Sequence, residues 1–269
     1  MASLQYDRSF LPSHGSPSPR GGRHGSGPPP FPVYGPLSSR RLGRSLGVDL
    51  TPPGHRVCNF DCAYCEVSRA LPVQAGADAW PRPRAVAEAL AIALRRCGRL
   101  DSITISGHGE PTLHPRFAAV VQCILEESLR HRPRVPVRIL TNGSGAVRPE
   151  VRRALDRLDE RIATIDAGAE KLDRPCPQAP LGSIVHGLSM LRDVTAQSCF
   201  VEGVVSNVGD DTVADWAELV AEIQPRRVQI YTVNRIPAAC GVWPASPARL
   251  QEIASVLRAR TGISADVFA

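Results

Sequence analysis

Short apolar runs alternate with segments of helical periodicity along most of this chain, and this alternation restricts the fold more than any other sequence feature. Six runs have the length and composition of buried strands: Leu46–Leu50, Ser102–Ser106, Val135–Leu140, Ile162–Ile165, Phe200–Val205 and Val228–Tyr231. The intervening segments space their apolar residues as amphipathic helices do, at about 84–97, 116–130, 149–158, 183–193, 212–223 and 247–260. Such alternation indicates parallel strands joined by right-handed crossovers.

The number of strand–helix units favours a barrel-like arrangement of the sheet. No Gly-x-Gly-x-x-Gly sequence follows the first strand, so a dinucleotide-binding fold has no support. We therefore predict an α/β fold, a partial (β/α)6 barrel, formed by one domain of residues 31–269. In such a barrel the chemistry lies at the C-terminal ends of the strands.

The first 30 residues differ in composition from the rest of the chain. Seventeen of them are Gly, Pro or Ser, and few are aliphatic. Segments of this kind bury too little apolar surface to offset the entropy lost on ordering. We expect residues 1–30 to form a disordered tail.

Charge, hydropathy and cysteine content narrow the function classes. The 32 Lys and Arg residues exceed the 26 Asp and Glu residues by only six, and their even spread gives a nucleic-acid partner no support. No apolar stretch is long enough for a transmembrane helix, and the N-terminus has no signal-peptide core. Eight cysteines then indicate metal binding or reactive thiols in a cytoplasmic protein rather than disulfides.

Three cysteines lie close together just after the first predicted strand. Cys58, Cys62 and Cys65 are separated by three and then two residues, so one loop can direct all three thiols at a small inorganic cluster. A [4Fe–4S] cluster normally takes four cysteines, and three would leave one iron open for another ligand. The alternative is a structural zinc site, with His55 as its fourth ligand.

A second candidate site follows the second predicted strand. Gly107 and Gly109 allow the backbone to approach a ligand closely, and Glu110 places a carboxylate at the strand end. A cationic ammonium group is a natural partner for this carboxylate. The alternative is a glycine-rich turn whose glutamate faces solvent.

The densest basic cluster, Arg40, Arg41 and Arg44, comes immediately before the first strand. This position puts it at the end of the barrel away from the cysteines, unless the segment folds across the barrel. A run of arginines is ordinarily a solvated face, and anion or RNA binding is the alternative.

The cysteine spacing, with the aromatic Tyr64 before the third cysteine, resembles that of the radical S-adenosylmethionine (radical SAM) superfamily. Four further segments resemble the branch related to wyosine-tRNA synthases: Tyr34–Gly47, Ser106–Pro115, Leu140–Ser144 and Asp166–Gly168. The resemblance runs from about residue 33 to the end of the chain. It implies a barrel of the radical SAM type.

The resemblance also implies a mechanism and two cofactors. Cys58, Cys62 and Cys65 would bind three irons of a [4Fe–4S] cluster, and the fourth iron would bind S-adenosylmethionine. Reductive cleavage of this cofactor would then yield a 5′-deoxyadenosyl radical that abstracts hydrogen from a substrate the sequence does not identify. The electron would come from a donor such as a flavodoxin or ferredoxin.

Several strand-end residues are implied contacts of S-adenosylmethionine. Asn142 follows the third predicted strand, Asp166 the fourth and Ser206 the fifth. From their residue types alone, Asn142 also suits an Asn-Gly turn and Asp166 a helix cap. The full set of expected contacts is Gly107, Gly109, Glu110, Asn142, Asp166, Ser206 and Tyr64.

The chain departs from the wyosine-forming enzymes in two ways. No cysteine precedes Cys58, so a second cluster is not expected, and Lys171 is the only lysine able to form a Schiff base. Wyosine formation is therefore disfavoured, and a related tRNA modification is the alternative within the branch. A non-catalytic iron–sulfur or zinc-binding protein is the alternative from another class. Cys176 and Cys240, in loops after strand ends, are candidate hydrogen-atom donors, and no catalytic residue is otherwise assigned.

Overall fold

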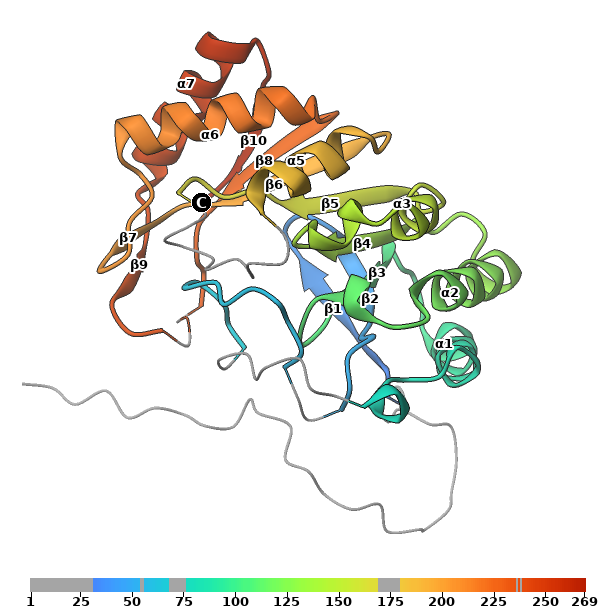
Figure 1. Cartoon of the computed structure of the whole chain (residues 1–269). Helices are drawn as coiled ribbons and strands as arrows, with labels where there is room; N and C mark the ends of the chain where they lie inside the picture. Colours follow the sequence, from blue (N-terminus) through green and yellow to red (C-terminus); the bar gives the residue numbers. More distant parts are fainter. Residues whose placement is uncertain (1–30, 54–55, 68–75, 169–179, 236, 238) are drawn as a thin grey trace, which may run out of the picture.

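A curved sheet with helices along its outer side forms the body of the protein (Figure 1). The computed structural model describes residues 31–53, 56–67, 76–168, 180–235, 237 and 239–269. The main sheet contains β1 (Val33–Ser39), β2 (Gly43–Val48), β3 (Ser102–Ile105), β4 (Val137–Thr141), β5 (Glu160–Thr164), β6 (Val194–Cys199), β8 (Arg227–Tyr231) and β10 (Ala265–Phe268). A separate ribbon contains β7 (Val201–Gly203) and β9 (Val242–Pro244).

The strand order places the ends of the parallel strands along one edge. The order is β1-β2-β3-β4-β5-β6-β8-β10, and every neighbouring pair from β2 onward is parallel. Only β1 runs antiparallel, as the outer arm of a hairpin with β2. Loops that follow β2, β3, β4, β5 and β6 therefore meet at the same C-terminal edge.

The helices cover one face of the sheet, and their sequences show why. They are α1 (Pro83–Arg96), α2 (Phe117–His131), α3 (Pro149–Leu155), α5 (Leu181–Ser189), α6 (Asp210–Ile223) and α7 (Pro247–Thr261), with short turns η1 (Ala77–Ala79), η2 (Pro111–Leu113) and η3 (Ser144–Val147). In α1, proline occupies the first turn, and Val86, Leu90 and Leu94 are fully buried at helical spacing. Burying this apolar face against the strands stabilises the layer.

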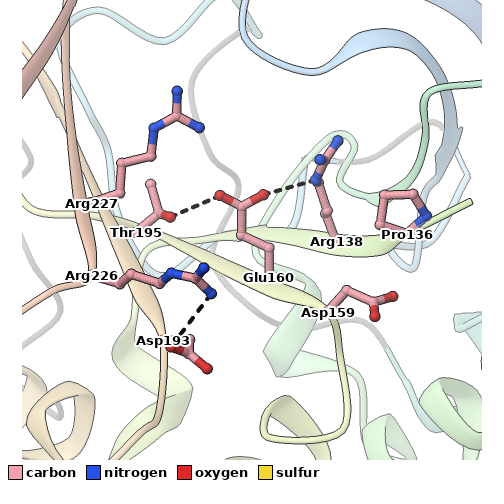
Figure 2. Close-up of a pocket in the computed structure, with 8 residues that line it drawn as sticks. All are labelled: Pro136, Arg138, Asp159, Glu160, Asp193, Thr195, Arg226 and Arg227. Carbon is pink, nitrogen blue, oxygen red and sulfur yellow. Dashed lines mark hydrogen bonds and ion pairs between the residues drawn. The ribbon is translucent and has the colours of Figure 1, made fainter.

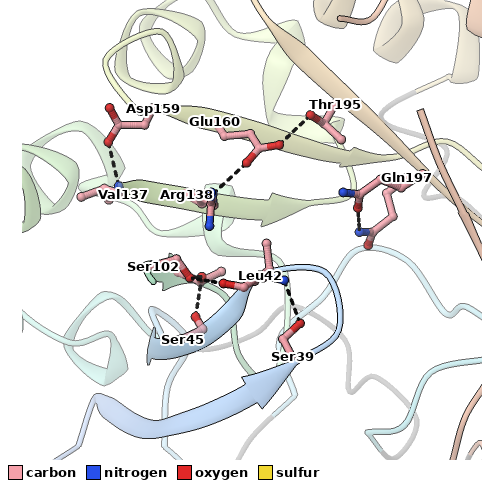
Figure 3. Close-up of polar contacts among 12 residues, drawn as sticks. Ser39, Leu42, Ser45, Ser102, Val137, Arg138, Asp159, Glu160, Thr195 and Gln197 are labelled. Carbon is pink, nitrogen blue, oxygen red and sulfur yellow. Dashed lines mark hydrogen bonds and ion pairs between the residues drawn. The ribbon is translucent and has the colours of Figure 1, made fainter. Parts of the chain in front are cut away.

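The two faces of the sheet differ in chemistry. In β4, Val137 and Ile139 pack into the main core, whereas Arg138 points to the opposite, concave face. Figure 3 shows the polar character of that face. The carboxylate of Glu160 lies 2.8 Å from Nε of Arg138 and accepts a hydrogen bond of 2.8 Å from the hydroxyl of Thr195. The concave side of the sheet is therefore lined with polar groups rather than filled with apolar ones.

One predicted strand is wrong. The fifth parallel strand is β6, and the apolar run Phe200–Val205 instead leads into the small ribbon through β7. The reason is that Thr195 and Gln197 of β6 face the polar concave side, so this strand lacks an apolar run. The edge strands β1 and β10 were also not predicted.

The predicted fold class is confirmed: the structure is an α/β fold built on a mostly parallel sheet with helices between the strands. Within the described part of the chain the sheet is open, with β1 and β10 as its edges. The predicted tail, residues 1–30, lies outside the described residues. Among the residues described, no helix is both long and apolar enough to cross a membrane.

Candidate functional site

The three clustered cysteines lie in the loop that follows β2, at the C-terminal edge of the sheet. All three are of intermediate exposure. Cys58 and Cys62 pack against the main core, which anchors the start of the loop. The backbone N–H of Cys65 donates to the carbonyl of Cys62 at 3.1 Å, and this tight turn keeps the last two cysteines close together.

The sulfur of Cys58 receives two N–H groups. The backbone of Phe60 approaches it at 3.4 Å and the side-chain amide of Asn142 at 3.9 Å. Burial, with a further contribution from the nearby Glu110, raises the pKa of Cys58 to about 11. Without a metal this thiol stays protonated, and binding an iron would displace the proton. N–H groups directed at sulfur are a feature of iron–sulfur ligation, so this donor set fits a cluster.

A site for a single metal ion such as zinc would require several ligand side chains directed at one point. In the portion of the chain that the structure describes, no three His, Cys, Asp or Glu side chains are grouped to hold one ion. His55, the fourth ligand considered for zinc, lies outside the described residues. A [4Fe–4S] cluster places each cysteine on a different iron, so its thiols need not meet at one point.

The carboxylate of Glu110 is buried and hydrogen-bonded on both oxygens. Its Oε1 accepts from the backbone N–H of Thr112 at 3.0 Å and from the hydroxyls of Thr112 at 2.6 Å and Thr141 at 2.7 Å. Its Oε2 accepts from the backbone N–H of Asn142 at 2.7 Å. Burial raises the pKa of Glu110, and these bonds counter part of that rise. The alternative of a solvent-facing glutamate is wrong, because only 2% of the residue is exposed.

The two glycines before Glu110 lie against other strand-end segments. A Cβ on Gly109 would stand 1.8 Å from the carbonyl oxygen of Val57, and one on Gly107 would stand 2.1 Å from the carboxylate carbon of Asp49. The backbone N–H of Glu110 donates to the same Val57 carbonyl at 2.9 Å. Glycine is therefore required here for the β3 loop to contact the residue that precedes the first cysteine.

Asn142 connects the end of β4 to the cysteine loop. Its side-chain amide donates to Asn59 at 2.9 Å, and its carbonyl oxygen accepts from the hydroxyl of Ser144 at 2.7 Å. Asn59 in turn donates to the hydroxyl of Ser144 at 2.9 Å. Gly143, the next residue, has a left-handed φ of 77°, as expected for an Asn-Gly turn. Asn142 therefore forms this turn and also contacts the cysteine loop.

Asp166 and Tyr64 form a second connection to the loop. The phenol of Tyr64 donates to Asp166 Oδ2 at 2.5 Å, and the backbone N–H of Cys199 donates to Oδ1 at 2.6 Å. Only 2% of Asp166 is exposed. The carboxylate thus joins the residue before Cys65 to the end of β6.

Within the part of the chain that the structure describes, the remaining predicted residues form no hydrogen bond with the cysteine loop. Ser206 is exposed beyond the β7 ribbon, while its neighbour Asn207 is buried and bonded to backbone groups. Cys240 is exposed in the segment before β9. Cys176 and Lys171 lie outside the described residues.

The pair of Asp49 and His108 was missed by sequence reasoning. The buried carboxylate of Asp49 accepts from the backbone N–H of His108 at 3.1 Å and contacts its Nδ1 at 2.6 Å. This hydrogen bond raises the pKa of His108. The signal was available, because Asp49 is a polar residue at the end of the first apolar run, beside the predicted site.

The basic cluster before β2 is divided by the structure. Arg44 is exposed, and its backbone N–H donates to Asp101. Arg41, in the turn between β1 and β2, lies with its guanidinium carbon 4.0 Å from the centre of the Tyr231 ring at the end of β8. The hairpin therefore folds across the sheet, which the sequence had left open.

A cavity of about 350 Å³ lies at the opposite end of the sheet from the cysteines (Figure 2). Its charges are largely paired, with Arg138 on Glu160 at 2.8 Å and Arg226 on Asp193 at 3.6 Å. The residues that line it belong to the N-terminal ends of the strands and the loops before them: Pro136, Arg138, Asp159, Glu160, Asp193, Thr195, Arg226 and Arg227. This cavity is not part of the candidate site.

Comparison with known proteins identifies the family. Residues 53–220 match the model of the radical SAM superfamily, so the chain belongs to this superfamily. The predicted membership is confirmed, and with it the enzyme class and its two cofactors, a [4Fe–4S] cluster and S-adenosylmethionine. Enzymes of this class also need a reductant and a substrate.

The chain is also similar to individual proteins over about three quarters of its length. The chain is 31% identical over 217 residues to a UPF0026 protein of Helicobacter pylori, covering 77% of this chain and 67% of the relative. It is 30% identical over 210 residues to a protein named GTPase Obg of Brachyspira hyodysenteriae, covering 76% of this chain. The chain spans only 30% of the length of this second relative.

Solved structures share the fold at low sequence identity. Streptococcus suis SuiB, bound to S-adenosylmethionine, aligns with a TM-score of 0.58 at 12% identity, covering 83% of this chain and 50% of SuiB. TYW1 with a lysine-pyruvate adduct bound aligns with a TM-score of 0.56 at 16% identity, covering 81% of this chain and 74% of TYW1. At these identities both likenesses show the shared fold.

Proposed function

We propose that this protein is a radical SAM enzyme whose cluster is held by Cys58, Cys62 and Cys65, and which removes a hydrogen atom from its substrate. The observation that carries the proposal is the cysteine loop itself. Three cysteines share one loop at the C-terminal edge of the sheet, and two N–H groups are directed at the sulfur of Cys58. When bound, the cluster supplies the electron that cleaves S-adenosylmethionine.

The polar residues around the loop position it. Asn142 donates to the sulfur of Cys58 and to Asn59, while its own backbone is held by Glu110. Asp166 holds Tyr64 from the other side of the loop. These bonds fix the loop relative to three different strand ends, which is the kind of support that keeps metal ligands in place.

The amino group of S-adenosylmethionine would lie beside Gly107, Gly109 and Glu110. From the residues that the structure describes, Oε2 of Glu110 accepts one hydrogen bond, so it retains capacity to accept another from an ammonium group. We assign Asn142, Asp166 and Tyr64 to the same cofactor site. Ser206 is assigned to it as well, because its neighbour Val205 packs against the same buried cluster as Tyr64. The electron would come from a donor such as a flavodoxin or ferredoxin. The alternative is a tRNA-modifying enzyme of the wyosine-like branch.

Iron content of single cysteine variants tests the ligand assignment. After anaerobic reconstitution with iron and sulfide, the wild-type protein is expected to hold about four irons. Cys58→Ala, Cys62→Ala and Cys65→Ala should each lose most of this iron and all cleavage of S-adenosylmethionine. Cys123→Ala is the matched control, because this thiol belongs to α2. Full iron in any of the three variants, or a tightly held zinc in the wild type, would contradict the assignment.

A further inference from the structure

The turn between β1 and β2 reaches across the open side of the curved sheet. Arg40, in this turn, donates from its guanidinium to the backbone carbonyl of Ala269, which follows β10 at the far edge. Its neighbour Arg41 lies over the ring of Tyr231, with 4.0 Å between the guanidinium carbon and the ring centre. Figure 3 shows Ser39 and Leu42 of the same turn on the side of the sheet to which Arg138 points.

The alternation of side chains along β8 shows which face Arg41 approaches. Val228 and Ile230 pack into the main core beneath the helices. Gln229 lies on the other face, where it accepts a hydrogen bond from Gln197 at 2.8 Å. Tyr231 is two residues further along and so shares the face of Gln229. Arg41 therefore lies on the polar, concave side of the sheet.

Tyr231 also places Arg41 near the cysteine loop. Tyr231 packs against a small buried cluster that contains Cys199, and Ala63 and Tyr64 of the cysteine loop pack against the same cluster. Burial, with smaller contributions from Cys199 and Asp166, raises the pKa of Tyr231 well above its usual value. The ring of Tyr231 attracts the guanidinium of Arg41 without bringing an opposite charge to it.

Arg41 differs in its ion pairing from Arg138 and Arg227, which lie on the same face. Arg138 is paired with Glu160 at 2.8 Å, and Arg227 is paired with Asp266 at 2.5 Å. Among the residues that the structure describes, no carboxylate lies within 4.0 Å of the Arg41 guanidinium, and the guanidinium donates no hydrogen bond. A partly buried guanidinium without a counter-charge is costly, and an anion placed beside it would offset this cost.

We propose that Arg41, which lies over the ring of Tyr231, binds an oxyanion of the substrate, a phosphate or a carboxylate, on the concave face beside the cysteine loop. The proposal rests on the proposed function, because it takes the molecule bound there to be the substrate of that site. The planar guanidinium offers two parallel N–H groups to such an anion. The contact with Tyr231 holds the guanidinium on this face of the sheet.

The test measures binding of two simple anions to the reconstituted protein. Inorganic phosphate is titrated while its phosphorus resonance is followed, and acetate is titrated in competition, both at constant ionic strength. The wild type is expected to broaden the phosphate signal saturably, and Arg41→Gln to weaken binding about tenfold or more. Arg41→Lys keeps the charge but loses the two-point contact, so its affinity should fall between them. Displacement of phosphate by acetate would indicate a carboxylate substrate, and failure to displace it a phosphate.

Arg44→Gln is the matched control, since it removes one positive charge from the same hairpin at an exposed position. It should bind phosphate as the wild type does. Equal affinities of the wild type and Arg41→Gln, or no saturable binding by the wild type, would overturn the inference. Circular dichroism of each variant verifies that it is folded. Phosphate binding does not require cleavage of S-adenosylmethionine, so a wild type that fails to cleave the cofactor refutes the proposed function without deciding this inference.

Discussion

Replacing Glu110 by glutamine tests whether its carboxylate holds two strand ends together. Four donor groups meet the carboxylate, three at Oε1 and one at Oε2. A glutamine can accept through one of these positions only, because its other terminal group is itself a donor. The least costly orientation keeps the three bonds at Oε1 and turns the amide N–H₂ toward the backbone N–H of Asn142.

The magnitude follows from what this orientation loses. One hydrogen bond to a charged group contributes about 1.5–3 kcal/mol, and a buried donor left unsatisfied costs about 1–3 kcal/mol. Removing a buried charge returns part of this, since burial raises the pKa of Glu110. A net loss of about 2–4 kcal/mol lowers the melting temperature by roughly 5–10 °C in a chain of this size.

Thermal unfolding followed by circular dichroism measures the effect. Glu150→Gln is the matched control, because Glu150 has a 58% exposed side chain and its partner Arg148 is 4.0 Å away. The control should unfold within about 1 °C of the wild type. If Glu110 also binds the ammonium group of S-adenosylmethionine, Glu110→Gln should weaken cofactor binding about tenfold. A melting temperature of Glu110→Gln within about 1 °C of the wild type would show that the carboxylate does not hold the two strand ends together.

Three further predictions concern other parts of the chain. Tyr64→Phe removes the hydrogen bond to Asp166 and should lower the free energy of unfolding by about 1–3 kcal/mol in urea titrations; no loss would contradict its role. His108 has its pKa raised by Asp49, so the pair stabilises the fold below the ordinary value of about 6.5 and loses this contribution as pH rises through the raised pKa. The difference in unfolding free energy between wild type and His108→Gln should shrink over that interval, and a constant difference would count against the pair. Deletion of residues 1–30 should leave the melting temperature within about 1 °C, whereas a large drop would show that the segment packs.

The parts of the fold that the sequence predicts are those with a local signal. The strands β3 and β4 and most of β8 carry short apolar runs, because one face of each packs under the helices. The cysteine spacing marks the loop, and the glycines and the glutamate after β3 mark the neighbouring strand end. Since parallel strands end at one edge, placing these motifs together needed only the alternation of strands and helices.

The parts that escaped prediction depend on contacts between distant segments. The polar residues Thr195 and Gln197 interrupt any apolar run in β6, so its sequence does not indicate a buried strand. Both residues make hydrogen bonds on the polar concave face, which the sequence alone does not show. The burial of Glu110 depends on Thr141 and Asn142, which follow it by about thirty residues. The position of Arg41 depends on a hairpin that crosses to β8. Local sequence patterns do not indicate which distant segments pack together.

Formation of 5′-deoxyadenosine shows whether this protein cleaves S-adenosylmethionine reductively. The protein is reconstituted anaerobically with iron and sulfide, reduced with dithionite, and incubated with S-adenosylmethionine. A radical SAM enzyme should form 5′-deoxyadenosine and methionine in equal amounts, and the Cys58→Ala variant, or the wild type without the reductant, should form none. A wild-type protein that carries the full complement of iron and still yields no 5′-deoxyadenosine would contradict the proposed function.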